Sequence, residues 1–477
     1  MMLKKTKIVA SISDLRCDED FIRELFEAGM NVVRMNTAHA NREGFEKLIA
    51  NVRKVSNRIA ILMDTKGPEV RTTDLIDGEP IPFHTGERVA VTGDPTRKTS
   101  HDCIAVSYPH FVHDLQIGET ILIDDGDLEL AVVEKDEAAN KLVCEVRNEA
   151  TLGNHKSVNV PGVRINLPSL TEKDRNNILY AIEKDIDFIA HSFVRNKQDV
   201  LDIRKILDEH HSTIKIIAKI ENQEGVDNID EILEVADGIM VARGDLGIEV
   251  PQERIPGIQR ILIRKCVMAR KPVIVATEVL GSMVSSPVPT RAEASDCANA
   301  VLDGADATMT SNETAVGKYP AVTVNTMSRI STFATEHGFD RIPELKNLDM
   351  SSTGAVSSAA VDLADKLNAK AIVAYTQTGS TVHRVSRERP ATPIYGITNN
   401  EHPFHWLALS WGTESFLVDE DYHDKSRKDL MVFTDKVLKD AGKVSDGDKI
   451  VVLSSAQGEH QPGRTDSIYV HTVGACD

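Results

Sequence analysis

The feature that most constrains the fold of this chain is a repeated alternation of short apolar runs with helical stretches. Eight runs rich in Val and Ile follow one another, at Lys7–Ile12, Asn31–Asn36, Ala60–Thr65, Asp187–Phe193, Ile214–Glu221, Gly238–Leu246, Pro272–Leu280 and Ala305–Thr310. Most are continuously apolar, which is typical of parallel strands buried on both faces. Apolar residues recur at helical spacing in most gaps, as in Asp20–Ala28, Val200–Glu209 and Gln259–Ala269. Eight strand–helix units predict an α/β fold, a (β/α)8 TIM barrel.

One gap in the alternation, from Lys66 to Ile186, is too long for a single helix. It contains strand-like segments separated by turn residues, at Arg88–Thr92, Thr120–Ile123, Leu128–Val133 and Lys141–Val146. We therefore predict that residues 67–168 form an inserted small β domain. The barrel would then consist of residues 1–66 and 169–345.

A third unit begins after about Asp340, where the pattern of helices and strands restarts. A helix is predicted at Val356–Leu367. Strands are predicted at Ala371–Tyr375, Ile394–Ile397 and Lys449–Leu453, with an edge strand at Ser467–Val473. Residues 346–477 are thus predicted to form an open α/β domain.

Charge and hydropathy exclude several classes of function. The chain has 55 basic and 73 acidic residues and a formal net charge of −18, which argues against nucleic acid or an anionic membrane as a partner. No apolar run reaches the roughly 18 residues of a membrane span. The N-terminus leads into a strand and does not read as a signal peptide. The six cysteines are scattered without a Cys-x-x-Cys pair, so we expect free thiols and a cytoplasmic location.

Charged and polar side chains gather where the predicted strands end, which is where such barrels place active sites. They are Arg34 and Asn36, Asp64 to Lys66, Lys219 and Glu221, Arg243 to Asp245, Thr277 and Glu278, and Ser311 to Thr314. Glu221 and Asp245 are the hard oxygen ligands of which Mg²⁺ usually takes one or two, the rest coming from water or substrate. Lys219 lies two residues before Glu221 and therefore points to the same side of its strand.

The alternative interpretation of Lys219 and Glu221 is a buried ion pair that only closes the barrel. We favour a functional site, because barrel interiors are mostly apolar and several charges at strand ends need a reason. Arg34 and Arg71 are of the type that binds phosphate oxygens in bidentate fashion. Surface salt bridges would use the same two residues.

Several motifs resemble those of the pyruvate kinase family, in that family's order and spacing along nearly the whole chain. They are Lys-Thr-Lys-Ile-Val (5–9), Ala-Gly-Met-Asn-Val-Val-Arg-Met-Asn (28–36), Asp-Thr-Lys-Gly-Pro-Glu-Val-Arg-Thr (64–72), Val-Asn-Val-Pro-Gly (158–162), Ala-Lys-Ile-Glu-Asn-Gln-Glu-Gly (218–225), Asp-Gly-Ile-Met-Val-Ala-Arg-Gly-Asp-Leu-Gly (237–247), Pro-Thr-Arg-Ala-Glu (289–293) and Glu-Thr-Ala-Val-Gly-Lys-Tyr-Pro (313–320). The resemblance implies a phosphotransferase that makes pyruvate and ATP from phosphoenolpyruvate and ADP, the last step of glycolysis. It also implies that the inserted unit is a small β-barrel lid, that the C-terminal domain is regulatory, and that the chain forms a homotetramer.

The resemblance further implies roles for individual residues. Those implied for the divalent cation, Mg²⁺ or Mn²⁺, are Glu221 and Asp245, with Lys219 against the transferring phosphoryl group. Those implied around the substrate are Ala242, Gly244, Asp245 and Thr277, the last near the face where the enolate is protonated. Those implied around the nucleotide and phosphoryl groups are Arg34, Asn36, His39, Arg71 and Lys156. Those implied for K⁺ are Asn36, Asp64 and Thr65, and Glu69 matches the residue typical of potassium-dependent members.

Four positions depart from the family's pattern. Ala38 lacks the hydroxyl that the family uses on its monovalent cation, and Asp14 adds a negative charge to a loop beside the nucleotide. Glu278 replaces Gln, and Asn312 replaces Gly, which is tolerable if φ is positive there. The divalent-metal set is intact, so we expect activity with altered nucleotide or ion behaviour.

A second candidate site lies in the C-terminal domain. Thr376, Thr378, Gly379, Ser380 and Thr381 belong to a loop that follows a strand and opens a helix, and hydroxyls and backbone N–H groups there can hold an anion. The loop resembles the one that holds a sugar-phosphate effector in the family. Arg464 is placed to close over such a ligand. The alternative is an ordinary helix cap.

Two other functions stay open at this point. One is another metal-enolate reaction on the same barrel, such as that of an oxaloacetate decarboxylase or a C–C lyase. The other is a catalytically weakened paralogue that senses metabolites through the C-terminal loop. The departures at Ala38, Asp14 and Glu278 motivate the second, and the intact Lys219 and Asp245 argue against it.

Overall fold

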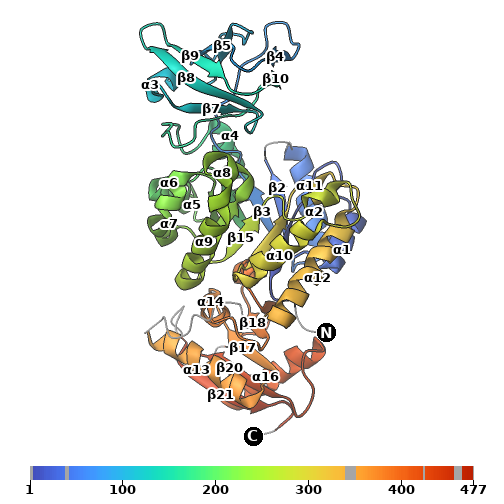
Figure 1. Cartoon of the computed structure of the whole chain (residues 1–477). Helices are drawn as coiled ribbons and strands as arrows, with labels where there is room; N and C mark the ends of the chain where they lie inside the picture. The colour runs from blue at the N-terminus through green and yellow to red at the C-terminus, as the bar shows by residue number, and fades with distance from the viewer. Residues whose placement is uncertain (1–3, 38–41, 339–350, 423–424, 456–464, 476–477) are drawn as a thin grey trace.

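The computed structural model describes residues 4–37, 42–338, 351–422, 425–455 and 465–475. Figure 1 shows three units in a row, with a β-rich unit at the top, a barrel in the middle and an α/β unit at the bottom. Ala38, His39, Arg464, Cys476 and residues 339–350, where the third unit is predicted to begin, lie outside the described residues. The residues at which one unit passes into the next stay a prediction.

The middle unit is a closed parallel barrel, as predicted. Its strands are β1 (Lys7–Ser11), β2 (Val32–Asn36), β3 (Ala60–Asp64), β12 (Phe188–His191), β13 (Lys215–Ile220), β14 (Gly238–Ala242), β15 (Val273–Ala276) and β16 (Ala307–Thr310). Each pairs with its neighbours in chain order, and β1 pairs with both β2 and β16 to close the ring. Every residue of β1, β3, β12, β14, β15 and β16 is buried, which explains why these runs are apolar without alternation.

Three of the predicted strands are too long at their carboxyl ends. The run Gly238–Leu246 ends as a strand at Ala242, and helix α8 (Arg243–Glu249) begins directly after it. The runs Asp187–Phe193 and Pro272–Leu280 end as strands at His191 and Ala276. Phe193, Thr277 and Glu278 have φ of 55°, 67° and 52°, which no extended strand allows. The chain therefore turns sharply at the ends where the site residues lie.

Helices surround the barrel and bury their apolar faces on its outer surface. They are α1 (Glu19–Ala28), α2 (Arg42–Val55), α4 (Glu172–Glu183), α5 (Lys197–Glu209), α6 (Gln223–Asp227), α7 (Ile229–Val235), α9 (Ile255–Ala269), α10 (Arg291–Leu302), α11 (Asn312–Ala315) and α12 (Pro320–Gly338), with 3₁₀ turns at Gln252–Arg254 and Gly281–Val284. Capping side chains stabilise the N-termini of several of these helices: Asp18 caps α1, Asn196 caps α5, and Thr171 forms a capping box with Asp174 on α4. The three predicted helices correspond to α1, α5 and α9.

An aspartate precedes three of the barrel strands and fixes their lower ends. Asp187, Asp237 and Asp306 each accept a hydrogen bond from the backbone N–H of a residue in the preceding strand of the barrel, at 2.7, 2.9 and 3.0 Å. The donors are Ile61, Ile216 and Val273. These carboxylates lie at the end of the barrel opposite to the candidate active site.

The inserted unit is built on sheets of its own. Its elements are β4 (Ile81–Phe83), β5 (Arg88–Thr92), β6 (Cys103–Ala105), α3 (Phe111–Asp114), β7 (Thr120–Ile123), β8 (Leu128–Asp136), β9 (Lys141–Val146), β10 (Ala150–Leu152) and β11 (Val158–Asn159). Six strands form a sheet in the order β11-β7-β8-β9-β5-β6, and β10 pairs with β4. A separate hydrophobic core, which includes Phe83, Phe111 and Ile121, holds the unit together.

The C-terminal unit is an open five-stranded sheet in the order β19-β18-β17-β20-β21. The strands are β17 (Ala371–Tyr375), β18 (Ile394–Thr398), β19 (Thr413–Leu417), β20 (Lys449–Ser454) and β21 (Ser467–Thr472), with helices α13 (Ser352–Leu367), α14 (Ser380–Arg387), α15 (Glu401–Trp406) and α16 (Arg427–Asp440) and a 3₁₀ turn at Leu407–Leu409. β21 lies at the edge, as predicted, and it runs antiparallel to β20. β19 was not predicted, because this edge strand reads Thr-Glu-Ser-Phe-Leu and is only partly buried.

Two further expectations bear on the chain as a whole. No helix within the described residues is long and apolar enough to span a membrane. Cys17, Cys103, Cys144, Cys266 and Cys297 are buried free thiols, in agreement with the expectation for these five.

Candidate active site

A cavity of about 530 Å³ lies at the carboxyl ends of the barrel strands. It brings together many of the residues singled out from the sequence, namely Arg34, Asn36, Asp64, Thr65, Lys66, Glu69, Arg71, Lys219, Glu221 and Asp245. These residues come from β2, β3, β13, α8 and the segment that enters the inserted unit. The closed parallel barrel explains the convergence, because all of its strands end on one rim.

Lys219 is the centre of this cluster. Its Nζ lies 2.7 Å from Ser192 Oγ, 2.9 Å from Glu221 Oε1 and 3.2 Å from Asp64 Oδ1. Burial opposes the charged ammonium, but the surrounding carboxylates overcome this effect and hold the pKa of Lys219 above its ordinary value. A positive charge is therefore held at the floor of the cavity.

Arg34 and Asp64 form a second pair beside Lys219. The guanidinium of Arg34 places Nε and Nη2 each 2.6 Å from Asp64 Oδ2, and its Nη1 donates to Ser11 Oγ at 2.9 Å. Burial alone would raise the pKa of Asp64, but the charges of Arg34 and Lys219 lower it below its ordinary value. These contacts with Asp64 and Ser11 fix the orientation of the Arg34 guanidinium at the wall of the cavity.

Glu221 and Asp245 form the candidate divalent-metal site. Burial, the largest effect, and the charge of Asp245 together raise the pKa of Glu221 to about 7 against the opposing charge of Lys219. Glu221 also accepts a hydrogen bond from the backbone N–H of Phe193. Two carboxylate oxygens that repel each other across a cavity fit a Mg²⁺ or Mn²⁺ ion, which would remove this repulsion and take its other ligands from substrate and water. Within the described residues no group of three or more His, Cys, Asp or Glu is placed to hold a metal.

The candidate K⁺ ligands also line the cavity. Asn36, Asp64 and Thr65 supply amide, carboxylate and hydroxyl or carbonyl oxygens, a donor set that fits a hard monovalent cation. Thr65 is tied down by the backbone N–H of Ser192, which donates to its Oγ1 at 3.1 Å. Ala38 and His39, which the resemblance places nearby, lie outside the described residues.

Thr277 and Gly244 meet at the ends of β14 and β15. They line neither this cavity nor a second, larger cavity at the same rim. The backbone N–H of Gly244 donates to Thr277 Oγ1 at 2.7 Å, and this hydroxyl donates to the carbonyl of Ala276 at 2.7 Å. Arg243 braces the loop by donating to the carbonyl of Thr277 at 2.9 Å. Two consecutive non-glycine residues with positive φ, Thr277 and Glu278, are strained backbone of the kind that clusters at functional sites.

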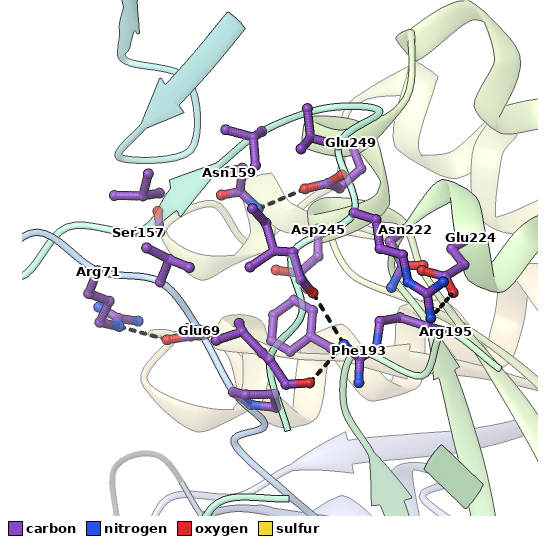
Figure 2. A pocket seen from close by; sticks show the side chains of 18 of the residues that line it. Glu69, Arg71, Ser157, Asn159, Phe193, Arg195, Asn222, Glu224, Asp245 and Glu249 are labelled. Carbon is purple, nitrogen blue, oxygen red and sulfur yellow. Dashed lines mark hydrogen bonds and ion pairs between the residues drawn. The ribbon is translucent and has the colours of Figure 1, made fainter. Parts of the chain in front are cut away.

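A second cavity of about 1000 Å³ separates the inserted unit from the barrel and shares Glu69, Arg71 and Asp245 with the first (Figure 2). Lys156 lines this cavity from the inserted unit, and its Nζ lies 2.6 Å from Asp124 Oδ2. Arg71 Nε lies 2.6 Å from Glu69 Oε2. Both cations are thus paired with nearby carboxylates, which for Arg71 agrees with the alternative of a surface salt bridge. Both side chains nevertheless line the cavity as well.

Three of the four departures from the family pattern can be placed. The Asp14 side chain lies against Gly44 in the first turn of α2 and lines neither of the two cavities. Glu278 is exposed. Asn312 begins helix α11 and is not among the residues with positive φ, so the condition set for it does not apply. A helical φ suits Asn as well as Gly.

Sequence reasoning missed Ser192 and Phe193, which follow β12 and line the cavity. Besides Lys219, Ser192 Oγ contacts the carbonyl of Thr65 at 2.6 Å. The candidate residues predicted from the sequence come from six of the eight strand ends, and the end of the fourth strand carries the same signal for Ser192 and Phe193. His155, which also lines the cavity, carries no comparable signal, because it belongs to the inserted unit.

The candidate effector loop is folded on itself. Thr376 Oγ1 accepts from the backbone N–H of Gly379 at 2.9 Å, and Gly379 takes φ of 81°. Gly379, with no side chain to cap, precedes α14, so the alternative of an ordinary Ser/Thr cap is wrong. Thr381 Oγ1 lies 2.6 Å from Thr465 Oγ1. Thr378 is exposed and Ser380 half-buried, and Arg464 lies outside the described residues.

Comparisons with known proteins agree with this geometry. The family model "Pyruvate kinase, barrel domain" matches residues 3–324, and "Pyruvate kinase, alpha/beta domain" matches residues 354–471. The chain is 41% identical to a pyruvate kinase of Borreliella burgdorferi over 99% of this chain and 98% of that one. It is 44% identical to a pyruvate kinase of Bacillus licheniformis over 99% of this chain and 81% of that one.

The structure is also similar to a crystal structure of a pyruvate kinase from Cryptosporidium parvum, with a TM-score of 0.91 and 35% identity over 98% of this chain and 96% of that one. The fold, the convergence of the motif residues at one rim and these matches along nearly the whole length agree. The chain belongs to the pyruvate kinase family, and it is a phosphotransferase.

Proposed function

We propose that this chain transfers the phosphoryl group of phosphoenolpyruvate to ADP, giving pyruvate and ATP, with a divalent cation and K⁺. The observation that carries the proposal is the open cavity around Lys219, whose ammonium is held charged by Asp64 and Glu221 at the strand ends. A buried ion pair that only closed the barrel would leave no space beside it.

The arrangement suits phosphoryl transfer, which needs positioning and charge neutralisation more than covalent catalysis. Lys219 and Arg34 face the cavity, and we assign them to the oxygens of the transferring group. Glu221 and Asp245 would hold the divalent cation, which supplies further charge stabilisation when bound. The inserted unit carries Lys156 and Arg71 to the adjoining cavity of about 1000 Å³, where they would contact the nucleotide and keep water out.

The substrate carboxylate is assigned to the backbone around Ala242 and Gly244. The N–H of Gly244 donates to Thr277 Oγ1, so a bound carboxylate would take over this donor. The Thr277 oxygen would then be free to accept a hydrogen bond from a water molecule and orient it toward the enolate, while its O–H still donates to the carbonyl of Ala276. The bond to the Ala276 carbonyl and the contact of Arg243 with the Thr277 carbonyl keep that hydroxyl in place.

The test is production of pyruvate and ATP from phosphoenolpyruvate, ADP and Mg²⁺, with K⁺, Na⁺ or no added monovalent cation. We expect turnover that Asp245→Ala lowers about 10²- to 10³-fold, since one charge-stabilising group is lost. A rate that does not respond to K⁺ would show that the Asn36, Asp64 and Thr65 set does not act as proposed.

The same samples separate the two other functions. Release of CO₂ from oxaloacetate without nucleotide-dependent turnover would favour a decarboxylase. Absence of turnover with ADP and with other nucleoside diphosphates would favour a metabolite sensor. Either result would overturn the proposal.

We also propose that the loop from Thr376 to Thr381 binds a sugar phosphate that regulates turnover. Support comes from the resemblance of the loop, from the exposed Thr378 and half-buried Ser380, and from the tight turn at Gly379. A panel of sugar mono- and bisphosphates should include one that raises the thermal midpoint, and Thr381→Val should weaken this shift. Equal shifts for the variant and the parent would contradict this placement.

Homotetramer formation is a proposal that rests on the family alone. Light scattering should give a mass near four chains. A stable monomer or dimer at micromolar concentration would contradict it.

A further inference from the structure

One of the hydrogen bonds between the inserted unit and the barrel lies next to the candidate metal site. Asn159 of β11 donates through Nδ2 to Glu249 Oε1 at the end of α8, at 3.1 Å. Figure 2 shows these two side chains reaching toward each other across the cavity, near Asp245. Asn159 belongs to the Val-Asn-Val-Pro-Gly motif (158–162), but the resemblance implies no role for it, and Glu249 lies outside every motif.

Local structure explains why Asn159 faces the barrel. Val158 and Val160 are 5% and 3% exposed and belong to the hydrophobic core of the inserted unit. Successive side chains in extended chain point to opposite sides, so Asn159 between them must point away from that core. Strand β11 pairs with β7 on one side, and on the other the backbone N–H of Val158 donates to the carbonyl of Val70 at 2.9 Å, in the segment by which the chain enters the inserted unit.

Glu249 lies where a carboxylate is not expected. It is the last residue of α8, where the partial negative charge of the helix end disfavours an anion. It also lies four residues after Asp245, on the same face of this helix. Burial and the charge of Asp245 raise the pKa of Glu249, while the bond from Asn159 lowers it. Within the described residues, Asn159 gives Glu249 its one side-chain hydrogen bond.

Two other contacts connect the inserted unit with the barrel at this side. Arg195, held by Asp199 of α5 at 3.0 Å, donates to the carbonyl of Leu167 at 2.9 Å, where the chain returns to the barrel. This contact lies where the chain passes from one unit to the other, so it does not fix the angle between the inserted unit and the barrel. Arg164 and Glu224 lie 3.6 Å apart with Arg164 71% exposed, a geometry that contributes little.

We propose that Asn159 and Glu249 are positioning residues, a pair that holds the inserted unit over the cavity in the position from which nucleotide binds. Because Glu249 shares α8 with Asp245 and Gly244, the pair connects the position of the lid with the helix that carries a metal ligand. The proposal rests on the proposed function only in its kinetic part.

The kinetic test compares four enzymes. Asn159→Asp sets two carboxylates against each other, and the KM for ADP should rise about tenfold, as expected for losing one hydrogen bond to a charged group. The kcat at saturating ADP should stay within about twofold, because bound nucleotide restores the closed position. Asn159→Asp combined with Glu249→Gln reverses donor and acceptor and should return the KM to within about threefold of the parent.

Arg164→Gln is the matched control, since it removes a lid–barrel contact of the exposed kind and should change neither constant. A merely structural role for Asn159 would lower kcat or the folded fraction without a selective rise in KM. Such a result, or a double variant no better than Asn159→Asp, would overturn the proposal.

A distance measurement tests the pair without turnover. Spin labels at Glu137→Cys on the inserted unit and Glu209→Cys on α5 can be introduced in a Cys476→Ser background, because the five described cysteines are buried. Asn159→Asp should shift or broaden the label distance, and the double variant should restore it. An unchanged distribution would overturn the inference. A restored distribution in enzymes without any turnover would support it and overturn only the proposed function.

Discussion

The two ends of the barrel bury similar charges but differ in the space beside them. At the rim with the strand carboxyl ends, Lys219 is 8% exposed and faces a cavity of about 530 Å³. At the opposite end, against the C-terminal unit, Lys5 and Lys7 are 4% and 5% exposed. A cavity at that end, lined by Asp306 and Arg389 among others, holds only about 10 Å³. A buried ionic cluster therefore indicates a binding site only where packing leaves space next to it.

The electrostatics of the two ends differ in the same sense. At the rim, carboxylates outweigh burial and hold the pKa of Lys219 high. At the opposite end, which we call the base of the barrel, burial outweighs the charges of nearby carboxylates and lowers the pKa of Lys5 and of Lys7 to about 8. The rim thus keeps a charge available, while the base uses its lysines to donate to backbone carbonyls, as Lys5 does to Pro390 at 2.7 Å.

The base is a joint between two units. Arg389 Nη1 lies 3.1 Å from Asp306 Oδ1, and its Nη2 donates to the carbonyl of Gly304 at 2.8 Å. The Arg389 guanidinium and the Lys5 ammonium lie 5.0 and 4.9 Å from the ring centroid of the fully buried Trp411. Charge here stabilises the contact between barrel and C-terminal unit.

The largest expected effect comes from removing the charge at the rim. Lys219→Met should lower kcat about 10³-fold, because the transferring group loses a cation in a site with low dielectric. The thermal midpoint should change little, since Arg34 still pairs with Asp64 and Glu221 can take up a proton. Turnover and calorimetry check both parts. A variant that unfolds would show that the rim cluster is structural.

The next largest effect is expected at the base, and it should have the opposite character. Asp306→Ala leaves Arg389 buried without its carboxylate partner and should cost about 3 kcal/mol of stability. The kcat per folded molecule should stay near the parent value. Denaturant unfolding and active-site titration measure the two quantities. Asp306→Asn, which keeps an acceptor for Val273, should lose less; an equal loss would contradict the explanation.

Low pH should destabilise the joint between the barrel and the C-terminal unit through His383, which lines the small cavity there. Burial lowers the pKa of His383 to about 4, below the value of about 6.5 expected in the unfolded chain. The unfolded chain therefore binds more protons between these values, and stability should fall as pH falls from about 6.5 to 4, by about 1–3 kcal/mol. His383→Gln should flatten this part of the profile. An unchanged profile would count against the burial of an uncharged imidazole.

The smallest effect is expected for an exposed ion pair of the same chemistry. Arg88 and Glu134 lie 3.0 Å apart on the inserted unit with both side chains 62% exposed. Arg88→Gln should change stability by less than about 0.5 kcal/mol, because water screens the pair and its side chains lose entropy. A loss as large as that of Asp306→Ala would show that burial does not explain the difference between the sites.

The strand pattern and the site residues differ in how far sequence could predict them. The eight strands follow from continuous apolar runs, and Lys219, Glu221 and Asp245 follow from their places at strand ends. The points at which β12, β14 and β15 end could not be predicted, because they depend on positive φ at Phe193 and Thr277 and on the start of α8. Strand β19 could not be recognised, since its half-polar sequence is stable only as the edge of a sheet already formed.

By itself, then, the sequence determined the barrel, the insertion after the third strand and the rim on which the charged residues meet. Periodicity and strand direction are local properties, and a closed parallel ring leaves few other arrangements. Only the tertiary structure decided which buried charges face open space, that Ser192 supports Lys219, and that Asn159 reaches Glu249. These contacts join residues far apart in the chain, and they depend on the volume left after every neighbouring side chain has packed.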